Sequence, residues 1–193
     1  MKLIRLIVLL MLLTAQGLAW SGYDEGLAAA KAGDYATALR EWRPLAKQGN
    51  SSAQYHLGIM YENGQGIPQD DKEAMNWYRK AAEQGHAAAQ YNLALMYRKG
   101  QGVPRDDEEA VSWYRKAAEQ GYIMAQNNLG IMYGSGLGVS QDYVQAYKWF
   151  NIAGASGDET GTKNRNSVAE KMTPAQIAEA QKLTKEWMEK HQQ

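Results

Sequence analysis

Apolar residues in the middle of the chain recur at helical spacing, in two stripes separated by a short polar stretch. Between residues 51 and 63, Ala53, Leu57, Met60 and Tyr61 hold positions i, i+4, i+7 and i+8, as on one face of an α-helix. A second stripe of the same kind consists of Ala74, Trp77, Tyr78, Ala81 and Ala82. Between them lies GQGIPQ, whose glycines allow a tight turn and whose proline stops a helix. The pattern predicts a helix, a turn and a second helix.

This helix-turn-helix unit is repeated with a period of 36 residues. The nonapeptide WYRKAAEQG occurs at residues 77–85 and again at 113–121, and AQYHLGIMY, AQYNLALMY and AQNNLGIMY begin at Ala53, Ala89 and Ala125. One such helix pair cannot bury its own apolar face, whereas stacked pairs can. The sequence therefore predicts an all-α fold, an α/α solenoid of helix-turn-helix repeats.

The period sets the predicted boundaries along the chain. They are a degenerate N-terminal half repeat or cap at 20–50, repeats 1, 2 and 3 at 51–86, 87–122 and 123–158, and C-terminal capping helices at 159–193. In the last segment, Thr173 followed by Pro174 is typical of a helix start.

The second helix of each repeat is predicted to begin at an acidic cap. Asp70, Asp106 and Asp142 each precede a Glu or Gln by three residues. In such a capping box the Asp side chain accepts a hydrogen bond from the amide of the third helical residue, while the Glu or Gln side chain reaches back to the cap. These aspartates therefore have a structural role, which argues against a catalytic one.

Residues 1–19 follow a different pattern, which is typical of a secretory signal peptide. Lys2 and Arg5 precede the apolar run LIVLLMLL, and small residues follow it. This run is too short to cross a bilayer, which takes about 20 apolar residues. We therefore expect cleavage after Ala19, a mature protein without a membrane span, and a periplasmic or secreted location.

Composition gives little sign of chemistry. The chain has 21 basic and 21 acidic residues, so no overall positive charge favours nucleic-acid binding, and Arg115 is expected to pair with Glu119 on the solvent face. It has no cysteine, which excludes a thiol nucleophile and disulfides. Its three histidines, His56, His86 and His191, are too scattered for a metal site, and His191 is expected to lie in a frayed C-terminus. No cofactor, metal or catalytic group is predicted.

The segment AQYNLALMYRKGQGVPRDDEEAVSWYRKAAEQG resembles the Sel-one-like repeat (SLR) family, a relative of the tetratricopeptide repeats. The resemblance covers residues 51–158. It implies a non-catalytic adaptor that binds a protein or peptide partner on the concave face of the solenoid, in envelope assembly or signalling. Some relatives have been described as penicillin-binding or weakly β-lactamase-like, so a hydrolase acting on cell-wall material or β-lactams is the alternative. A self-associating structural protein is a third alternative, and the oligomeric state is left open.

The candidate partner-binding residues lie on the first helices of the repeats, off the apolar stripe. They are Tyr55, His56, Ile59, Tyr91, Asn92, Leu95, Arg98, Asn127, Asn128 and Ile131. Asn92 and Asn128 hold equivalent positions, and each amide can donate to and accept from an extended peptide backbone. Arg98 and Lys99 form a local positive spot suited to a carboxylate. The alternative is that the tyrosines pack into the next repeat and the asparagines are solvated surface.

Replacing Asn92 and Asn128 together with alanine is expected to weaken partner binding and to leave the Tm nearly unchanged, because exposed amides add little to packing. Capture of a partner from envelope extract by the immobilised mature protein, and the Tm of both proteins, check this. A large fall in Tm with unchanged capture would contradict it.

Overall fold

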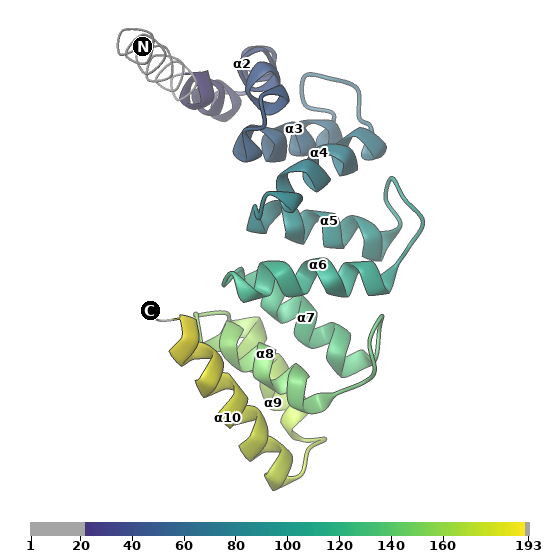
Figure 1. Ribbon diagram of the computed structural model, residues 1–193, viewed down its shortest axis with the longest axis vertical. Helices are drawn as coiled ribbons and strands as arrows, with labels where there is room; N and C mark the ends of the chain where they lie inside the picture. Colours follow the sequence, from purple (N-terminus) through teal and green to yellow (C-terminus); the bar gives the residue numbers. More distant parts are fainter. Residues whose placement is uncertain (1–21, 192–193) are drawn as a thin grey trace, which may run out of the picture. The chain divides into compact units, whose positions relative to one another are not determined.

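The computed structural model describes residues 22–191, and this part of the chain consists of α-helices joined by turns, with no β-strand (Figure 1). A helix over residues 22–31 comes first. The helices that follow are α2 (Tyr35–Lys47), α3 (Ser51–Asn63), α4 (Asp71–Glu83), α5 (Ala87–Lys99), α6 (Asp107–Glu119), α7 (Ile123–Ser135), α8 (Tyr143–Ala155), α9 (Glu159–Ala169) and α10 (Pro174–His191). The predicted all-α fold is confirmed. Repeats 1, 2 and 3 contain α3 and α4, α5 and α6, and α7 and α8.

The chain forms two compact units that divide between Gln84 and Gly85. The described part of the N-terminal unit contains the helix over residues 22–31, α2, α3 and α4. Its core is built around Trp42 of α2 and Leu57 and Met60 of α3, each at most 2% exposed. Helix α3 therefore packs against both α2 and α4.

The helix over residues 22–31 was not predicted from the sequence. It contains Gly22 and Gly26, and glycine is a poor helix former. Gly26 is buried against Trp42, so closely that a Cβ atom would overlap the indole ring, and the Trp42 Nε1–H donates to the carbonyl of Tyr23 at 3.2 Å. Tertiary packing on the tryptophan thus overrides the low helix propensity. Two helices lie in the segment expected to be a half repeat.

The C-terminal unit contains α5 to α10. Adjacent helices pack in sequence from α5 to α9, and α10 packs across α8 (Figure 1). One core cluster is built on Tyr114, Leu129 and Trp149, with Trp187 of α10 packed against it. A second cluster around Phe150 and Val168 lies where α8 meets the two last helices. The two C-terminal helices therefore cover the apolar side of repeat 3.

The turn between the paired helices is fixed by backbone hydrogen bonds. The Asp70 side chain accepts from the amide of Glu73, as expected of a cap, and the corresponding bonds form at Asp106 and Asp142. The prediction that the Glu or Gln side chain bonds back to the amide of the capping Asp is wrong. The amide of Asp70 instead donates to the carbonyl of Tyr61, at 3.0 Å, and the same pairing recurs in repeats 2 and 3. The reason is that the turn brings the chain back beside the last carbonyls of the first helix, which have no partner within that helix.

The first helices of the repeats differ in how they begin. Asn50 caps α3 and His86 caps α5, each through a side-chain acceptor for an amide of the first turn. At α7 the capping position holds Tyr122, and a tyrosine hydroxyl is too far from its own backbone to reach those amides. There the Ala125 amide donates to the Tyr122 carbonyl, at 2.9 Å. Helix α7 thus begins without a side-chain cap.

Replacing Gly138 with alanine is expected to lower the free energy of unfolding by more than about 3 kcal/mol. Gly138 has φ +64, and an added Cβ would overlap the carbonyl of Asp107 at the start of α6. The matched control is Gly121→Ala, because Gly121 has φ +82 but nothing within 4 Å of its Cβ position. That variant bears only the backbone strain, about 1–2 kcal/mol. Urea unfolding of both variants measures the difference, and equal losses would contradict the backbone contact.

Candidate functional site

The first helix of repeat 1 holds its three candidate residues in an aromatic cluster. The His56 ring stacks on Trp42, with ring centroids 4.4 Å apart and planes at 14°, and its Nε2 lies 3.1 Å from the Tyr23 hydroxyl. The Tyr55 ring lies 5.9 Å from that of Tyr78. All three candidates, including Ile59, are half-buried. His56 and Ile59 line a pocket of about 220 Å³ beside the helix over residues 22–31.

In the C-terminal unit the structure brings Tyr91 and Arg98 of α5 together with Asn128 of α7. The Tyr91 ring lies against Tyr114 and Tyr122, at centroid distances of 5.8 and 5.1 Å. Burial raises the pKa of Tyr91, against the opposing effects of a hydrogen bond with Asn128 and of the Arg98 charge. Tyr91 is therefore the half-buried aromatic member of this group, and Arg98 and Asn128 are its polar members.

This group differs from the equivalent group of repeat 1 in the residue that faces the buried tyrosine. In repeat 1 the Tyr78 hydroxyl donates to the Glu62 carboxylate at 2.5 Å. In repeat 2 the equivalent residues are Tyr114 and Arg98, so a guanidinium stands where the carboxylate would be. Arginine has no acceptor. A tyrosine that donates to a carboxylate in one copy faces a cation in the next.

The Tyr114 hydroxyl is buried and lacks the carboxylate acceptor of repeat 1. The residue is 0% exposed, and its hydroxyl makes no hydrogen bond of good geometry within residues 22–191, although the Arg98 and Asn128 side chains lie close to it. Burial raises the pKa of Tyr114 to about 12, and the neighbouring Arg98 and Asn128 side chains oppose the rise. Leaving such a group unpaired costs about 1–3 kcal/mol. We call Arg98, Tyr114 and Asn128 the repeat-2 polar cluster.

The other candidates on α5 and α7 have different surroundings. Asn127 accepts a hydrogen bond at its Oδ1 from Nδ2 of Asn164 on α9, at 2.9 Å. Ile131 and Asn164 line a pocket of about 170 Å³. Asn92 and Leu95 are half-buried on α5. Sequence reasoning missed Asn164 and Tyr114; the signal for Tyr114 was the exchange of the Glu at position 62 for Arg at the equivalent position 98 in repeat 2.

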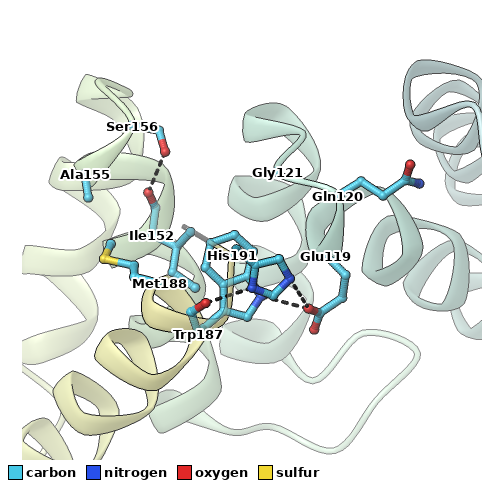
Figure 2. A pocket seen from close by; sticks show the side chains of 9 residues that line it. All are labelled: Glu119, Gln120, Gly121, Ile152, Ala155, Ser156, Trp187, Met188 and His191. Atoms are coloured by element: carbon cyan, nitrogen blue, oxygen red, sulfur yellow. Dashed lines mark hydrogen bonds and ion pairs between the residues drawn. The ribbon is translucent and has the colours of Figure 1, made fainter. Parts of the chain in front are cut away.

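Two expectations for the other side of the C-terminal unit are wrong. His191 does not lie in a frayed end: its ring stacks on Trp187, with centroids 4.0 Å apart, and its Nε2 is 3.6 Å from the Glu119 carboxylate (Figure 2). Glu119 does not pair with Arg115, because it accepts a hydrogen bond from Trp187 Nε1 at 2.7 Å, whereas Arg115 donates to the Tyr133 hydroxyl. Contacts from α10 to Glu119 and from α7 to Arg115 replace the exposed pair within α6.

The remaining histidine has a structural position. His86 accepts a hydrogen bond from the amide of Ala89 through Nδ1, at 3.2 Å, and burial lowers the pKa of this histidine. No group of three or more His, Asp and Glu side chains within residues 22–191 is placed to hold a metal ion. In the same range, no helix has both the length and the apolar character needed to cross a membrane. The predicted signal peptide, residues 1–19, lies outside the described residues.

A protein-family model described as Sel1 repeat matches residues 51–86, 87–122 and 123–158. A Sel1 repeat protein from Oxalobacter formigenes, solved by crystallography, is 38% identical over 72% of this chain and 58% of its own, with a TM-score of 0.70. No curated protein sequence is significantly similar to the chain.

Two further solved structures have the same kind of fold. The c5321 protein, a protective antigen present in uropathogenic Escherichia coli strains and displaying an SLR fold, is 33% identical over 92% of this chain and 47% of its own, with a TM-score of 0.64. Cysteine rich protein B of Helicobacter pylori, at 22% identity over 66% of this chain and 94% of its own and a TM-score of 0.52, is similar in fold. The chain thus spans 58% and 47% of the first two relatives. These neighbours confirm the predicted α/α solenoid fold class.

Tyr114→Phe is expected to change the free energy of unfolding by less than about 0.5 kcal/mol, because it removes a hydroxyl that has no acceptor. Tyr78→Phe removes the donor to Glu62 and is expected to cost about 1–2 kcal/mol. Urea unfolding of the two variants beside the parent protein measures both effects. An equal loss in the two variants would show that the Tyr114 hydroxyl is satisfied in solution.

Proposed function

Because the chain belongs to the Sel1 repeat family, we propose that it is an exported scaffold that binds an acidic segment of a partner protein at the repeat-2 polar cluster. Sel1 repeat proteins are generally non-catalytic scaffolds that mediate protein–protein interaction. The proposal adds the location of the binding site and the chemistry of the group that it recognises.

The observation that carries the proposal is the buried Tyr114 hydroxyl beside Arg98. Repeat 1 contains its own carboxylate, Glu62, at the equivalent place, where it accepts from Tyr78. A carboxylate of a partner supplies repeat 2 with the acceptor that its sequence lacks. It accepts from the Tyr114 hydroxyl and pairs with the guanidinium, and hydrogen bonds between charged groups are about twice as strong as neutral ones.

Arg98 is half-exposed on the last turn of α5, and the neighbouring Tyr114 hydroxyl is closed off from solvent. The long side chain moves aside as the carboxylate enters and then pairs with it from the solvent side. The incoming group thereby becomes largely desolvated, which strengthens its attraction to the guanidinium.

The surroundings favour a peptide segment over a small anion. The candidate polar groups are spread over α5, α7 and α9, where the Asn127 and Asn164 amides are bonded to each other. Primary amides of this kind keep further donor and acceptor positions for a peptide backbone. Half-buried Ile131 adds an apolar wall beside them. An acidic side chain bound at Arg98 would place its flanking backbone along these helices.

The charged and apolar pattern of residues 1–19 supports export. On this proposal the mature protein meets its partner in the periplasm or outside the cell, in envelope assembly or signalling.

The test uses an array of twelve-residue peptides in matched triplets that differ at one position, which is Glu, Gln or Lys. Peptides captured by the mature protein are expected to bind at least about 10-fold more tightly with Glu than with Gln. Arg98→Glu restores the arrangement of repeat 1 and is expected to abolish this capture in a protein of equal or higher Tm.

Lys182→Glu is the control, because it makes the same change of charge at a 75% exposed side chain on α10. It is expected to leave capture unchanged. The proposal fails if Glu and Gln peptides bind equally, or if Arg98→Glu and the parent protein capture the same peptides with equal affinity.

A further inference from the structure

The last turn of the second helix has lost its long polar side chains in repeat 3. Repeats 1 and 2 read KAAEQG at residues 80–85 and 116–121, whereas repeat 3 reads IAGASG at 152–157. Ile152, Ala155 and Ser156 therefore stand where the other repeats have lysine, glutamate and glutamine. All three line a cavity of about 380 Å³, together with residues near the ends of α6 and α10 (Figure 2). The cavity thus lies on the turn that repeat 3 has changed.

In repeats 1 and 2 the glutamine of this turn donates to a glutamine of the first helix, and we call this contact the glutamine pair. Its donor and acceptor are Gln84 and Gln54 in repeat 1 and Gln120 and Gln90 in repeat 2, and repeat 3 has Ser156 and Gln126 at these positions. Gln120, which lines the cavity, also donates from Nε2 to the carbonyl of Lys116. The Ser156 hydroxyl donates to the carbonyl of Ile152, at 3.2 Å. Both side chains therefore direct their donors at oxygens of the protein.

The donors that α10 contributes to the wall are engaged in the same way. Trp187 Nε1 donates to Glu119 Oε2 at 2.7 Å. His191 Nδ1 lies 2.7 Å from the carbonyl oxygen of Trp187, and a carbonyl only accepts, so the proton of a neutral ring is on Nδ1. The Nε2 atom of that ring is then an acceptor. Each side-chain donor among the described residues of the wall thus has an acceptor within the protein.

A ligand in this cavity meets acceptors instead. The Glu119 carboxylate lines the cavity, and its side chain is 42% exposed. Its contacts with Trp187 and His191 within residues 22–191 are both made by Oε2, which leaves Oε1 for a ligand. Helices α6 and α8 also end at the cavity, where the last carbonyl groups of a helix have no partner within it and carry partial negative charge. These groups favour a cationic donor.

The neighbouring cations do not occupy this position. Lys148 interacts electrostatically with Glu119, Arg115 and Lys190, but its Nζ lies over the Trp149 ring, 4.3 Å from the centroid. Burial lowers the pKa of Lys148, against the opposing effect of Glu119. In the part of the chain from residue 22 to residue 191, the carboxylate forms an ion pair only with the α10 histidine. These cations reduce the affinity for a further one, so we expect weak binding.

We propose that this cavity binds the side chain of a lysine from a partner protein. An ammonium group has three donors and no acceptor, so it matches a wall that offers acceptors. It donates to Glu119 Oε1, and His191 Nε2 is a second acceptor in the same wall. The methylene groups of the lysine pack against Ile152, Ala155 and Met188, the apolar part of the wall. The site shares no residue with the repeat-2 polar cluster and does not depend on it.

The experiment titrates the mature protein with N-acetyl-L-lysinamide and follows the Trp187 indole N–H resonance by NMR, assigned with Trp187→Phe. The titration is run at about pH 8, above the ordinary titration range of imidazole and below that of an alkylammonium. A saturable shift is expected, with a Kd in the millimolar range, as befits one small side chain. The absence of a saturable shift would overturn the proposal.

Three further compounds identify the group that is recognised. The Nε-acetyl derivative of the lysine compound removes the charge, and N-acetyl-L-norleucinamide keeps the stem without the ammonium group. Both are expected to bind at least about 10-fold more weakly, and equal binding by either would overturn the proposal. n-Butylammonium has the ammonium group and the stem without the peptide groups, and it is expected to bind about as tightly as the lysine compound. Binding of n-butylammonium more than about 10-fold tighter would identify a free amine as the ligand and contradict the proposal.

Variants locate the site. Glu119→Gln keeps the shape of the side chain and is expected to weaken binding of the lysine compound at least about 10-fold. The matched control is Glu83→Gln, which makes the same change at the equivalent position of repeat 1, outside the cavity, and is expected to bind like the parent protein. Ala155→Leu fills part of the cavity from an exposed position and is expected to abolish the shift with an unchanged Tm. Unchanged binding in Glu119→Gln or in Ala155→Leu, or an equal loss in Glu83→Gln, would show that the ligand binds elsewhere.

Discussion

The close approach of the two helices in each repeat, with one large ring set against one small residue, is the constraint on which the rest of the structure depends. A Cβ on Gly58 would stand 2.5 Å from Cδ1 of Tyr78, and a Cβ on Gly130 would stand 2.6 Å from Cε1 of Phe150. Real Cβ atoms do not come so close, so the glycines allow the helices to meet around the ring. Each ring buried in this way contributes about 2–3 kcal/mol of hydrophobic stabilisation.

Because the ring is buried, its outer end also needs a suitable environment. A tyrosine at this position needs an acceptor for its hydroxyl. Repeat 1 supplies Glu62, repeat 2 has Arg98 in its place, and repeat 3 has Phe150, which needs no acceptor. All three repeats keep this core contact, but the group that meets the outer end of the ring differs in each repeat. The glutamine pair at the helix ends varies in the same way, since repeat 3 has Ser156 in place of the donor glutamine, while Gln126 stays buried. The repeat-2 polar cluster therefore lies where one copy differs from its neighbours around an unchanged core.

The helices of the repeats could be read from the sequence because their apolar spacing, glycine ends and aspartate caps agree. The helix expected at residues 51–63 is observed as Ser51–Asn63. The helix over residues 22–31 could not be read in this way, since its stability comes from Gly26 packed on Trp42, a contact that propensity does not contain. The return bond of the caps was wrongly predicted for a related reason. A tyrosine carbonyl of the preceding helix competes for the Asp70 amide only once the turn has closed.

The candidate sites were less predictable than the helices, because they depend on side chains far apart in the sequence. Arg98 and Asn128 were named as candidates, but the unpaired donor beside them belongs to Tyr114, which the periodicity places in the core. The position of His191 was misjudged because its neighbours include Glu119, which a reading of the C-terminal helix alone does not bring near. An i, i+4 spacing from Trp187 was the local sign that this histidine lies over an indole ring.

The missing side-chain cap lowers the local stability of the start of α7. Local opening of a native protein begins where the free energy of opening is smallest, and a helix start without a side-chain cap lacks about 1 kcal/mol of protection. Asn127 and Asn128 lie in the first two turns of α7, directly after that start. Asn127 and Asn128 are thus carried by a helix start without a side-chain cap, which the buried side chains of Ala125, Gln126 and Leu129 hold in the core. On the proposed function, a partner bound to these amides would also stabilise the start of α7, and its affinity would include this contribution.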